Sequence, residues 1–517
     1  MSSSKKEVSQ HKVKFGRKCG VLLPISSIPS DYGIGSFSKE AYDFVDFLKK
    51  AGQSYWQILP LGPTSYGDSP YQSFSTFAGN PYFIDIENLI SLGFISKKDA
   101  DKFDFGDNES YVDYEKIYNS RFKLLKLAFN GSGFSSASAS SPSPEMAREF
   151  GLFVKENEEW LTDYALYMVI KNANNGLSWN EWKDEKLRLR DKDAISSFSK
   201  KNDDEINFYR FIQFMFSRQW NALKKYANES GIQIIGDIPI YVAFDSADTW
   251  SSPELFLLDK DNYPISVAGC PPDAFSATGQ LWGNPIYRWD YHKKTGFEWW
   301  IKRIAKCYSL YDVLRIDHFR GFDEYYAILA GDATAEFGKW EKGPGFDLFK
   351  AVGDKLGDLK IIAEDLGYLT PSVIKLVKKT GYPGMKVLQF AFDSREDSDY
   401  LPHNYKENCV VYTGTHDNDT TVGWFDAISR ADRKFAKQYL GIRGKKDIAP
   451  AMIRSALGSV AATAIIPVQD YLGLGTEARI NIPSTLGNNW KWRLNKKQCT
   501  EKLALEMYDL SRIYGRL

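Results

Sequence analysis

Residues 312–319 have the sequence DVLRIDHF, a short apolar run that contains Arg315 and ends near Asp317. Near-continuous apolar strands of this kind are typical of a parallel sheet that is buried on both faces. Helix-like stretches separate most of the similar runs, for example at 38–52 and 297–311. Seven further runs share the pattern: GVLLPIS (20–26), YWQILPL (55–61), IQIIGDIPIYV (232–242), LKIIAEDLG (359–367), MKVLQFAF (385–392), NCVVYTGTHD (408–417) and AATAIIPVQDYLGLG (461–475). Eight strands alternating with helices predict an α/β fold, a (β/α)8 TIM barrel.

Two intervals between these runs are too long for simple crossovers. Residues 62–231 predict an inserted, mostly helical subdomain between the second and third strands, with helices expected at 116–129, 145–175 and 204–230. Within it, the Ser-, Gly- and Pro-rich stretch 130–144 predicts a flexible or disordered loop. Residues 243–296 are rich in Pro, Gly and aromatic residues, which predicts irregular structure over the barrel mouth.

The expected domain plan is therefore one catalytic barrel with two insertions. A disordered N-terminal tail is expected over 1–16 and the catalytic barrel over 17–517. The helical insertion is expected over 62–231 between strands two and three, and the irregular insertion over 243–296 between strands three and four.

Composition narrows the classes of partner. Lys and Arg total 66, equal to Asp and Glu, so no basic surplus favours nucleic acid or an anionic membrane. Five scattered cysteines without a CxxC pattern fit a reducing compartment. The basic, polar N-terminus has no apolar stretch behind it, so a cytoplasmic location is expected. Aromatic residues make up 15% of the chain, which indicates either a large aromatic core or rings that line a sugar site.

Acidic residues follow four of the apolar runs: Asp237, Asp317, Glu364 with Asp365, and Asp417. The C-terminal ends of barrel strands meet at one mouth, so these side chains are expected to converge there. A lone acid at a strand end can equally cap a helix or bind within a loop. Several acids on one mouth favour glycosidic bond chemistry, in which one carboxyl protonates the leaving oxygen and another attacks or stabilises the anomeric carbon.

Arg315 lies two residues before Asp317, a spacing that places both side chains on one face of a strand. A guanidinium there is expected to fix Asp317 and keep it ionised, as a nucleophile requires; a structural ion pair inside the barrel is the compatible alternative. The competing use of carboxylates is a metal site, for which His318 and His416 are the possible partners. Asp317 and His318 are adjacent and are expected to point to opposite faces, so no metal and no cofactor is predicted.

Eight segments make the sequence similar to the amylomaltases, also called 4-α-glucanotransferases or disproportionating enzymes, of glycoside hydrolase family 77 in the α-amylase clan. They run in family order from residue 20 to 493: GVLLPISSIPSDYGIGSF (20–37), YWQILPLGPTSYGDSPYQSFSTFAGNPYFIDI (55–86), IIGDIPIYVAFDSADTW (234–250), GCPPDAFSATGQLWGNPIYRWD (269–290), LRIDHFRGF (314–322), IIAEDLG (361–367), THDNDTTVGW (415–424) and QDYLGLGTEARINIPSTLGNNWKWR (469–493). The stretch 130–144 and the first 16 residues lie outside the resemblance. The form of the SPYQSFSTFAGNP segment is nearer to bacterial members than to plastidial ones.

The resemblance implies a role for each matching residue. Asp317 corresponds to the nucleophile, Glu364 to the general acid/base and Asp417 to the acid that stabilises the transition state. Arg315 orients Asp317, Tyr71 stacks on the sugar at the cleavage point, and Asp237 and His416 line the sugar site. The 269–287 loop, with Asp273, Gln280 and Trp282, arches over the acceptor side. The weaker candidates for the rim are Ser69, Asn284, Pro285 and Asn481.

The reaction implied is a retaining double displacement in starch, glycogen or maltodextrin metabolism. Maltooligosaccharides and α-1,4-glucans are the expected donors, and a maltooligosaccharide or glucose is the expected acceptor. The chemistry of the carboxylates alone does not separate a transferase from an α-glucan hydrolase of the same clan; the resemblance favours the transferase. A catalytically silent glucan-binding protein is the third hypothesis, and the presence of all three acids disfavours it.

Overall fold

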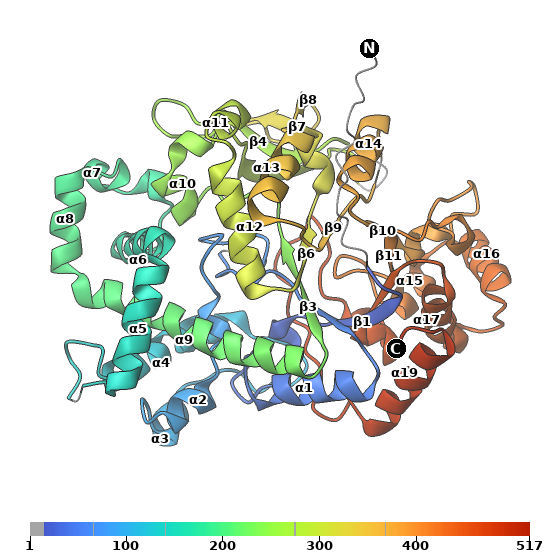
Figure 1. Ribbon diagram of the computed structural model, residues 1–517, viewed down its shortest axis with the longest axis horizontal. Helices are drawn as coiled ribbons and strands as arrows, with labels where there is room; N and C mark the ends of the chain where they lie inside the picture. The colour runs from blue at the N-terminus through green and yellow to red at the C-terminus, as the bar shows by residue number, and fades with distance from the viewer. Residues whose placement is uncertain (1–14, 66, 140, 273–275, 368) are drawn as a thin grey trace, which may run out of the picture.

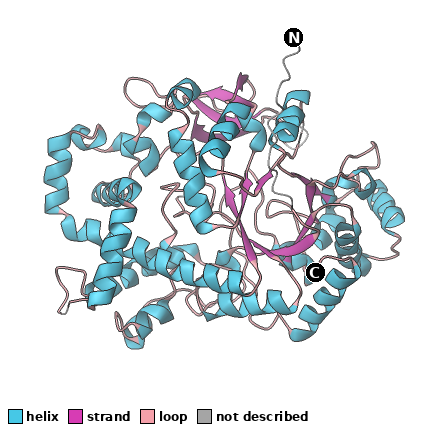
Figure 2. Ribbon diagram, viewed as in Figure 1, coloured by secondary structure: helices cyan, strands magenta, loops and turns pink. Residues whose placement is uncertain are grey.

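The chain folds around a closed barrel of eight parallel strands (Figure 2). A computed structural model describes residues 15–517, apart from 66, 140, 273–275 and 368, so most of the predicted tail lies outside the described residues. The barrel order is β1-β12-β11-β10-β9-β6-β3-β2. Each strand overlaps one of the eight apolar runs: β1 (Lys18–Leu22), β2 (Tyr55–Gln57), β3 (Gln233–Ile238), β6 (Val313–Ile316), β9 (Ile361–Ala363), β10 (Gly384–Val387), β11 (Cys409–Tyr412) and β12 (Thr463–Pro467). The predicted (β/α)8 barrel is confirmed.

Helices surround the barrel (Figure 1). They include α1 (Lys39–Lys50), α9 (Asp203–Glu229), α12 (Glu298–Leu310), α13 (Phe346–Leu356), α14 (Pro371–Thr380), α15 (Thr421–Ala427), α16 (Arg430–Leu440), α17 (Ile448–Gly458), α18 (Val468–Tyr471) and α19 (Glu501–Ile513). Local sequence sets their limits: α14 begins where the Thr370 hydroxyl accepts from the Val373 N–H and ends at Gly381, which has φ +73°. Among the described residues, no helix combines the length and apolar character needed to cross a membrane.

The insertion between β2 and β3 is helical. It contains α2 (Ile86–Ser91), α3 (Lys97–Ala100), α4 (Tyr114–Gly131), α5 (Pro144–Glu156), α6 (Glu158–Ala173), α7 (Glu185–Arg188) and α8 (Lys192–Lys201), and ends with α9. The single helix expected over 145–175 is two helices. They divide at Asn157, whose side chain donates to the Phe153 carbonyl and accepts from the Trp160 ring N–H. These local bonds compete with continuation of the helix.

The described part of 132–143 is a loop between α4 and α5 that is fastened to α9. Ser135 is buried, and its hydroxyl donates to the Asp204 carboxylate at 3.2 Å. The Ser136 backbone N–H donates to the same carboxylate at 2.6 Å. Composition predicts a flexible or disordered loop here, but it does not reveal a partner that lies more than 60 residues away along the chain.

A second, smaller sheet stands beside the barrel mouth (Figure 2). Its antiparallel strands have the order β5-β4-β7-β8 and comprise β4 (Ser266–Cys270), β5 (Gln280–Pro285), β7 (Glu324–Leu329) and β8 (Lys339–Lys342). The interval 243–296 was expected to be irregular. It contains β4 and β5, together with α10 (Ala247–Ser251) and α11 (Trp289–Lys294).

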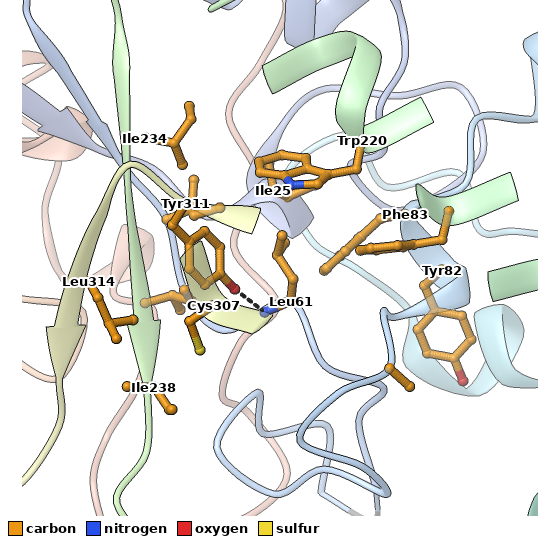
Figure 3. Close-up of a cluster of buried hydrophobic side chains, with 14 of the residues drawn as sticks. Ile25, Leu61, Tyr82, Phe83, Trp220, Ile234, Ile238, Cys307, Tyr311 and Leu314 are labelled. Atoms are coloured by element: carbon orange, nitrogen blue, oxygen red, sulfur yellow. Dashed lines mark hydrogen bonds between the residues drawn. The ribbon is translucent and has the colours of Figure 1, made fainter. Parts of the chain in front are cut away.

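One core contact joins the segment after β2 to a residue that precedes β6 (Figure 3). The hydroxyl of Tyr311 accepts from the backbone N–H of Leu61 at 3.3 Å. A Cβ at Gly236 would come within 2.1 Å of the Tyr311 ring, so the glycine just before Asp237 lets this ring pack directly on β3. Leu61 begins the segment that carries Tyr71. The contact therefore sets the segment against the strand whose end forms part of the site.

Arg516 closes the opposite, N-terminal side of the barrel. Its fully buried guanidinium donates to the carbonyls of Lys18, Leu457, Ser459, Ala461 and Ala462 at 2.7 to 3.2 Å. Replacing Arg516 with Met would remove all five of these hydrogen bonds, although Arg17 still donates to the Leu457 and Ser459 carbonyls and the Lys18 N–H to that of Ala462. The expected cost is on the order of 4 kcal/mol of unfolding free energy.

Urea unfolding of the Arg516→Met variant measures this loss. Arg512→Met is the matched control, because Arg512 lies on the same C-terminal segment and forms only an exposed ion pair with Asp509. We expect that control to cost less than about 1 kcal/mol. Equal unfolding midpoints for the two variants would refute the structural role of Arg516.

Candidate active site

Three acidic side chains stand at the same end of neighbouring barrel strands. Asp237 is the second-to-last residue of β3, Asp317 comes directly after β6, and Glu364 comes directly after β9. Ile316 lies opposite Ala363 in the ladder, so Asp317 and Glu364 take the next positions of two adjacent strands. The backbone N–H of Glu364 donates to the Ile316 carbonyl at 3.0 Å. The strand ends therefore converge as the sequence pattern predicts.

Arg315 links two of these carboxylates. Its Nη1 lies 2.5 Å from Oδ2 of Asp237, and its Nη2 lies 3.0 Å from Oδ1 of Asp317. Arg315 and Asp317 share one face, as their spacing predicts. The guanidinium is 3% exposed and rigidly held, so its planar donor fork fixes the direction of both carboxylates. Asp317 remains open to the mouth, with 28% of its side chain exposed.

Burial changes the protonation expected at Asp317. The loss of surrounding water raises its pKa above the usual range, although Arg315 opposes the shift. Arg315 thus acts in the predicted direction, toward the ionised form of Asp317, but burial outweighs it. Burial also raises the pKa of Glu364. Because two neighbouring negative charges disfavour each other, the pair is expected to hold one proton between its two carboxyls.

The backbone around His318 orients Glu364. His318 has φ +49°, a left-handed conformation that costs a non-glycine residue free energy and is often found at functional sites. Its backbone N–H donates to Oε2 of Glu364 at 2.7 Å, while the Leu366 N–H donates to Oε1 at 2.8 Å. Burial lowers the pKa of the His318 ring to about 3, so the ring is neutral. No metal-binding group of three or more His, Cys, Asp or Glu residues occurs among the described residues.

Asp417 reaches the mouth from a loop. It lies five positions beyond the last residue of β11, so its placement at a strand end was wrong. Oδ1 of Asp417 accepts from the Asn481 amide at 2.7 Å, and its carbonyl accepts from Arg479 at 2.8 Å. The Asn481 backbone N–H also donates to the carbonyl of His416 at 3.1 Å. These contacts fix the loop tip and leave 43% of the Asp417 side chain exposed.

Tyr71 and His416 form a second polar chain beside Asp237. The Tyr71 hydroxyl lies 2.6 Å from Oδ2 of Asp237 and 2.9 Å from Nε2 of His416. Burial raises the pKa of Tyr71 and lowers that of His416, so both are neutral. Tyr71 has one hydroxyl hydrogen, which goes to the carboxylate, so its oxygen accepts from the His416 Nε2–H. The two rings stack with centroids 5.3 Å apart.

The remaining predicted residues differ in their surroundings. The Trp282 ring packs edge-on against the His318 ring at 4.9 Å, and its N–H donates to the Gln280 side chain at 3.1 Å. Asn284 is buried, and its amide donates to the Val242 carbonyl and accepts from Gln72, so it braces the Tyr71 segment. The hydroxyl of Ser69 accepts from the Tyr71 backbone N–H at 3.3 Å. Pro285 is the last residue of β5, and Asp273 lies outside the described residues.

Comparison with known proteins assigns this chain to a family. The model of glycoside hydrolase family 77, described as 4-alpha-glucanotransferase, matches residues 23–499. The chain belongs to the 4-alpha-glucanotransferase family. The family resemblance and the enzyme class predicted from the sequence are thereby confirmed.

Members of the 4-alpha-glucanotransferase family match along nearly the whole chain. The enzyme from Clostridium butyricum is 50% identical and covers 96% of this chain and 100% of its own length. The enzyme from Streptococcus pneumoniae is 48% identical, covering 97% of this chain and 98% of its own. The structure of the amylomaltase from Streptococcus agalactiae in complex with acarbose has a TM-score of 0.93 at 43% identity. It covers 97% of this chain and 100% of its own.

Three residues around the site of this family member were missed by the sequence analysis. Arg479 and Trp490 approach it from the segment after β12: Arg479 contacts Asp417, and the Trp490 ring lies 5.9 Å from that of Tyr71. Asp470 is buried beside the loop that carries Asp417. Asp470 could have been found, because it follows the apolar run of β12 as the other acids follow theirs. Arg479 and Trp490 carry no such signal.

Proposed function

We propose that Asp317, Glu364 and Asp417 carry out the 4-α-glucanotransferase reaction on one glycosidic bond. The observation that carries this proposal is the placement of Asp317 and Glu364 at consecutive register positions of two adjacent strands, with Arg315 holding Asp317 at 3.0 Å. A retaining mechanism needs a nucleophile and an acid/base that flank the scissile bond at short range. Donors are α-1,4-glucans and maltooligosaccharides, and acceptors are maltooligosaccharides or glucose.

In the first half-reaction, Glu364 gives its proton to the leaving 4-oxygen and the bond between this oxygen and the anomeric carbon breaks. An Asp317 oxygen attacks the same carbon and forms a β-glucosyl ester. The shared proton must then sit on Glu364. Positive charge that develops at the anomeric carbon favours ionised Asp317, while the basic leaving oxygen draws the proton from Glu364.

In the second half-reaction, the Glu364 carboxylate removes a proton from the 4-hydroxyl of an acceptor glucan. That oxygen attacks the anomeric carbon, and the ester bond to Asp317 breaks. Two inversions restore the α configuration. Asp417, held by Asn481, faces the donor sugar with an exposed carboxylate and can hydrogen-bond hydroxyls more strongly as the ring distorts.

Transfer exceeds hydrolysis only when an acceptor is bound in line while water is excluded. Binding an acceptor at a high effective concentration gives it the advantage over water. Trp282 and the second sheet stand beside His318 and Glu364, where they can cover the acceptor side.

Incubation with maltotriose separates transfer from hydrolysis. We expect glucose and longer maltooligosaccharides to appear with little change in total reducing ends, because each transfer consumes one reducing end for every one it releases. The products are measured by anion-exchange chromatography alongside a reducing-sugar assay. A steady increase in reducing ends without longer products would identify a hydrolase.

We also propose that the enzyme works in the cytoplasm. All five cysteines are free, a state that suits a reducing compartment. Fractionation of source cells, with transferase activity measured in each fraction, tests this location. Activity confined to the extracellular fraction would contradict it.

A further inference from the structure

The loop that carries His416 and Asp417 is fastened at both of its ends by a single carboxylate. This 413–421 loop has Asp417 at its midpoint; it follows β11 and includes Thr421, the first residue of α15. Asp470 lies in α18, just after the neighbouring strand β12. Its Oδ2 accepts from the hydroxyls of Thr413 at 2.5 Å and Thr421 at 2.7 Å, and its Oδ1 accepts from the Thr421 backbone N–H at 2.8 Å. One side chain thus binds the first and last residues of the loop.

Asp470 lies too deep to touch a substrate. It is 2% exposed, and Thr413 and Thr421 are 0% exposed. No ion pair with a Lys or Arg side chain involves Asp470 within the described residues, so hydrogen bonds to the two threonines are what compensate its burial. A buried carboxylate that depends on these donors holds them in a defined place, because losing any of them leaves a buried polar group unpaired.

Other contacts hold the loop between its tip and its far end. The Gln389 side-chain amide donates to the Asp419 carbonyl at 2.8 Å, and the Thr476 hydroxyl donates to Oδ2 of Asp419 at 2.9 Å. Within the loop, the Asn418 side chain accepts from the backbone N–H and the hydroxyl of Thr415, both at 2.9 Å, which shapes the turn but does not attach it to the barrel. Asn481 and Arg479 hold the tip from a segment that follows α18. Asp470 therefore binds both ends of the loop, Gln389 and Thr476 hold Asp419, and Asn481 and Arg479 hold the tip.

We propose that Asp470 is a positioning residue of the transfer reaction, which holds Asp417 and His416 against the donor sugar by fastening both ends of the 413–421 loop. The inference rests on the proposed role of Asp417. It assigns to β12 and α18 a part in the chemistry, although neither touches the reacting atoms.

Replacement of Asp470 by Ala should lower kcat for maltotriose disproportionation about 10- to 100-fold, because small displacements of a catalytic group have effects of this size. KM should change less than about threefold, since the other substrate contacts remain. Asp470→Asn should keep kcat within about fivefold: its amide oxygen can still accept from the Thr421 N–H, and the two hydroxyls can turn to accept from the amide.

A control variant separates positioning from general loss of stability. Asp85 is a comparably buried aspartate that accepts two backbone N–H bonds at the start of α2, in the helical insertion. Asp85→Ala should lower the melting temperature without changing kcat, when both are measured below the unfolding range. A kcat for Asp470→Ala equal to that of Asp85→Ala would overturn the proposal.

A double-mutant cycle shows whether Asp470 acts through Asp417. Fluoride release from α-maltosyl fluoride is measured for Asp417→Asn, Asp470→Ala and the double variant. We expect each single variant to be slow and the double variant to be no slower than Asp417→Asn, because effects exerted through one group are not additive. Multiplicative losses would overturn the positioning role. A fully active Asp417→Asn variant would instead refute the proposed function itself.

Discussion

Asp317→Asn should lower kcat for glucan transfer by about 10⁴-fold or more, because an amide cannot form the glucosyl ester. The substitution keeps the shape of the side chain, so binding should persist. The initial rate of maltotriose disproportionation measures the loss, and calorimetric titration with maltotetraose measures binding.

Asp312→Asn is the control for this variant. Asp312 precedes the same strand at its opposite end, where it accepts from the Ile234 backbone N–H and the Asn228 amide. Its replacement should leave kcat unchanged within about threefold, since it is remote from the mouth. An Asp317→Asn variant that retains more than about 1% of the original kcat would contradict the role of nucleophile.

Glu364→Gln should reduce transfer from maltotriose by about 10³-fold while formation of the intermediate from α-maltosyl fluoride stays fast. Fluoride leaves without protonation, so the first step no longer needs an acid. The second step still lacks its base, and a burst of fluoride followed by a slow steady rate is expected. Stopped-flow detection of fluoride measures both phases.

The neighbouring Asp365 supplies the control for Glu364. Its carboxylate accepts from the Met385 backbone N–H at 2.7 Å, an interaction that Asp365→Asn can keep through the amide oxygen. The Asp365→Asn variant should show the same relative rate with maltotriose as with α-maltosyl fluoride. Equal losses with maltotriose and the fluoride in Glu364→Gln would contradict acid catalysis by Glu364.

The pH dependence of the two donors should differ for the same reason. Burial raises the pKa of Glu364, so this group stays protonated above the pH at which a free glutamate ionises. The rate of the first step from maltotriose should fall as pH rises through that pKa. With the fluoride donor this alkaline decline should vanish, because no proton is needed. The same alkaline decline with both donors would argue against the assignment.

The barrel was predictable because its strands need no information from distant residues. A strand buried on both faces is apolar throughout, and each run in the sequence overlaps a barrel strand such as β6 or β12. Asp317 and Glu364 could be placed for the same reason, since parallel strands bring their C-terminal ends to one mouth. Fold and nucleophile position therefore follow from local pattern and barrel geometry.

The features that could not be predicted depend on contacts between residues that lie far apart in the sequence. Strands β4 and β5 form because β4 pairs with β7, which lies beyond the next barrel strand. The attachment of Asp417 to Asn481, and that of Thr421 to Asp470, joins segments 64 and 49 residues apart. The raised pKa of Asp317 arises from burial, a property of the assembled mouth that no short motif contains.

The most direct test of Asp317 as the nucleophile locates the covalent bond. Glu364→Gln is incubated with α-maltosyl fluoride, quenched in acid, digested with pepsin and analysed by tandem mass spectrometry. We expect one maltosyl unit on the peptide that contains Asp317, attached to that carboxyl. A maltosyl group on Asp417 or Asp237 instead, or fluoride release without any labelled peptide, would contradict it.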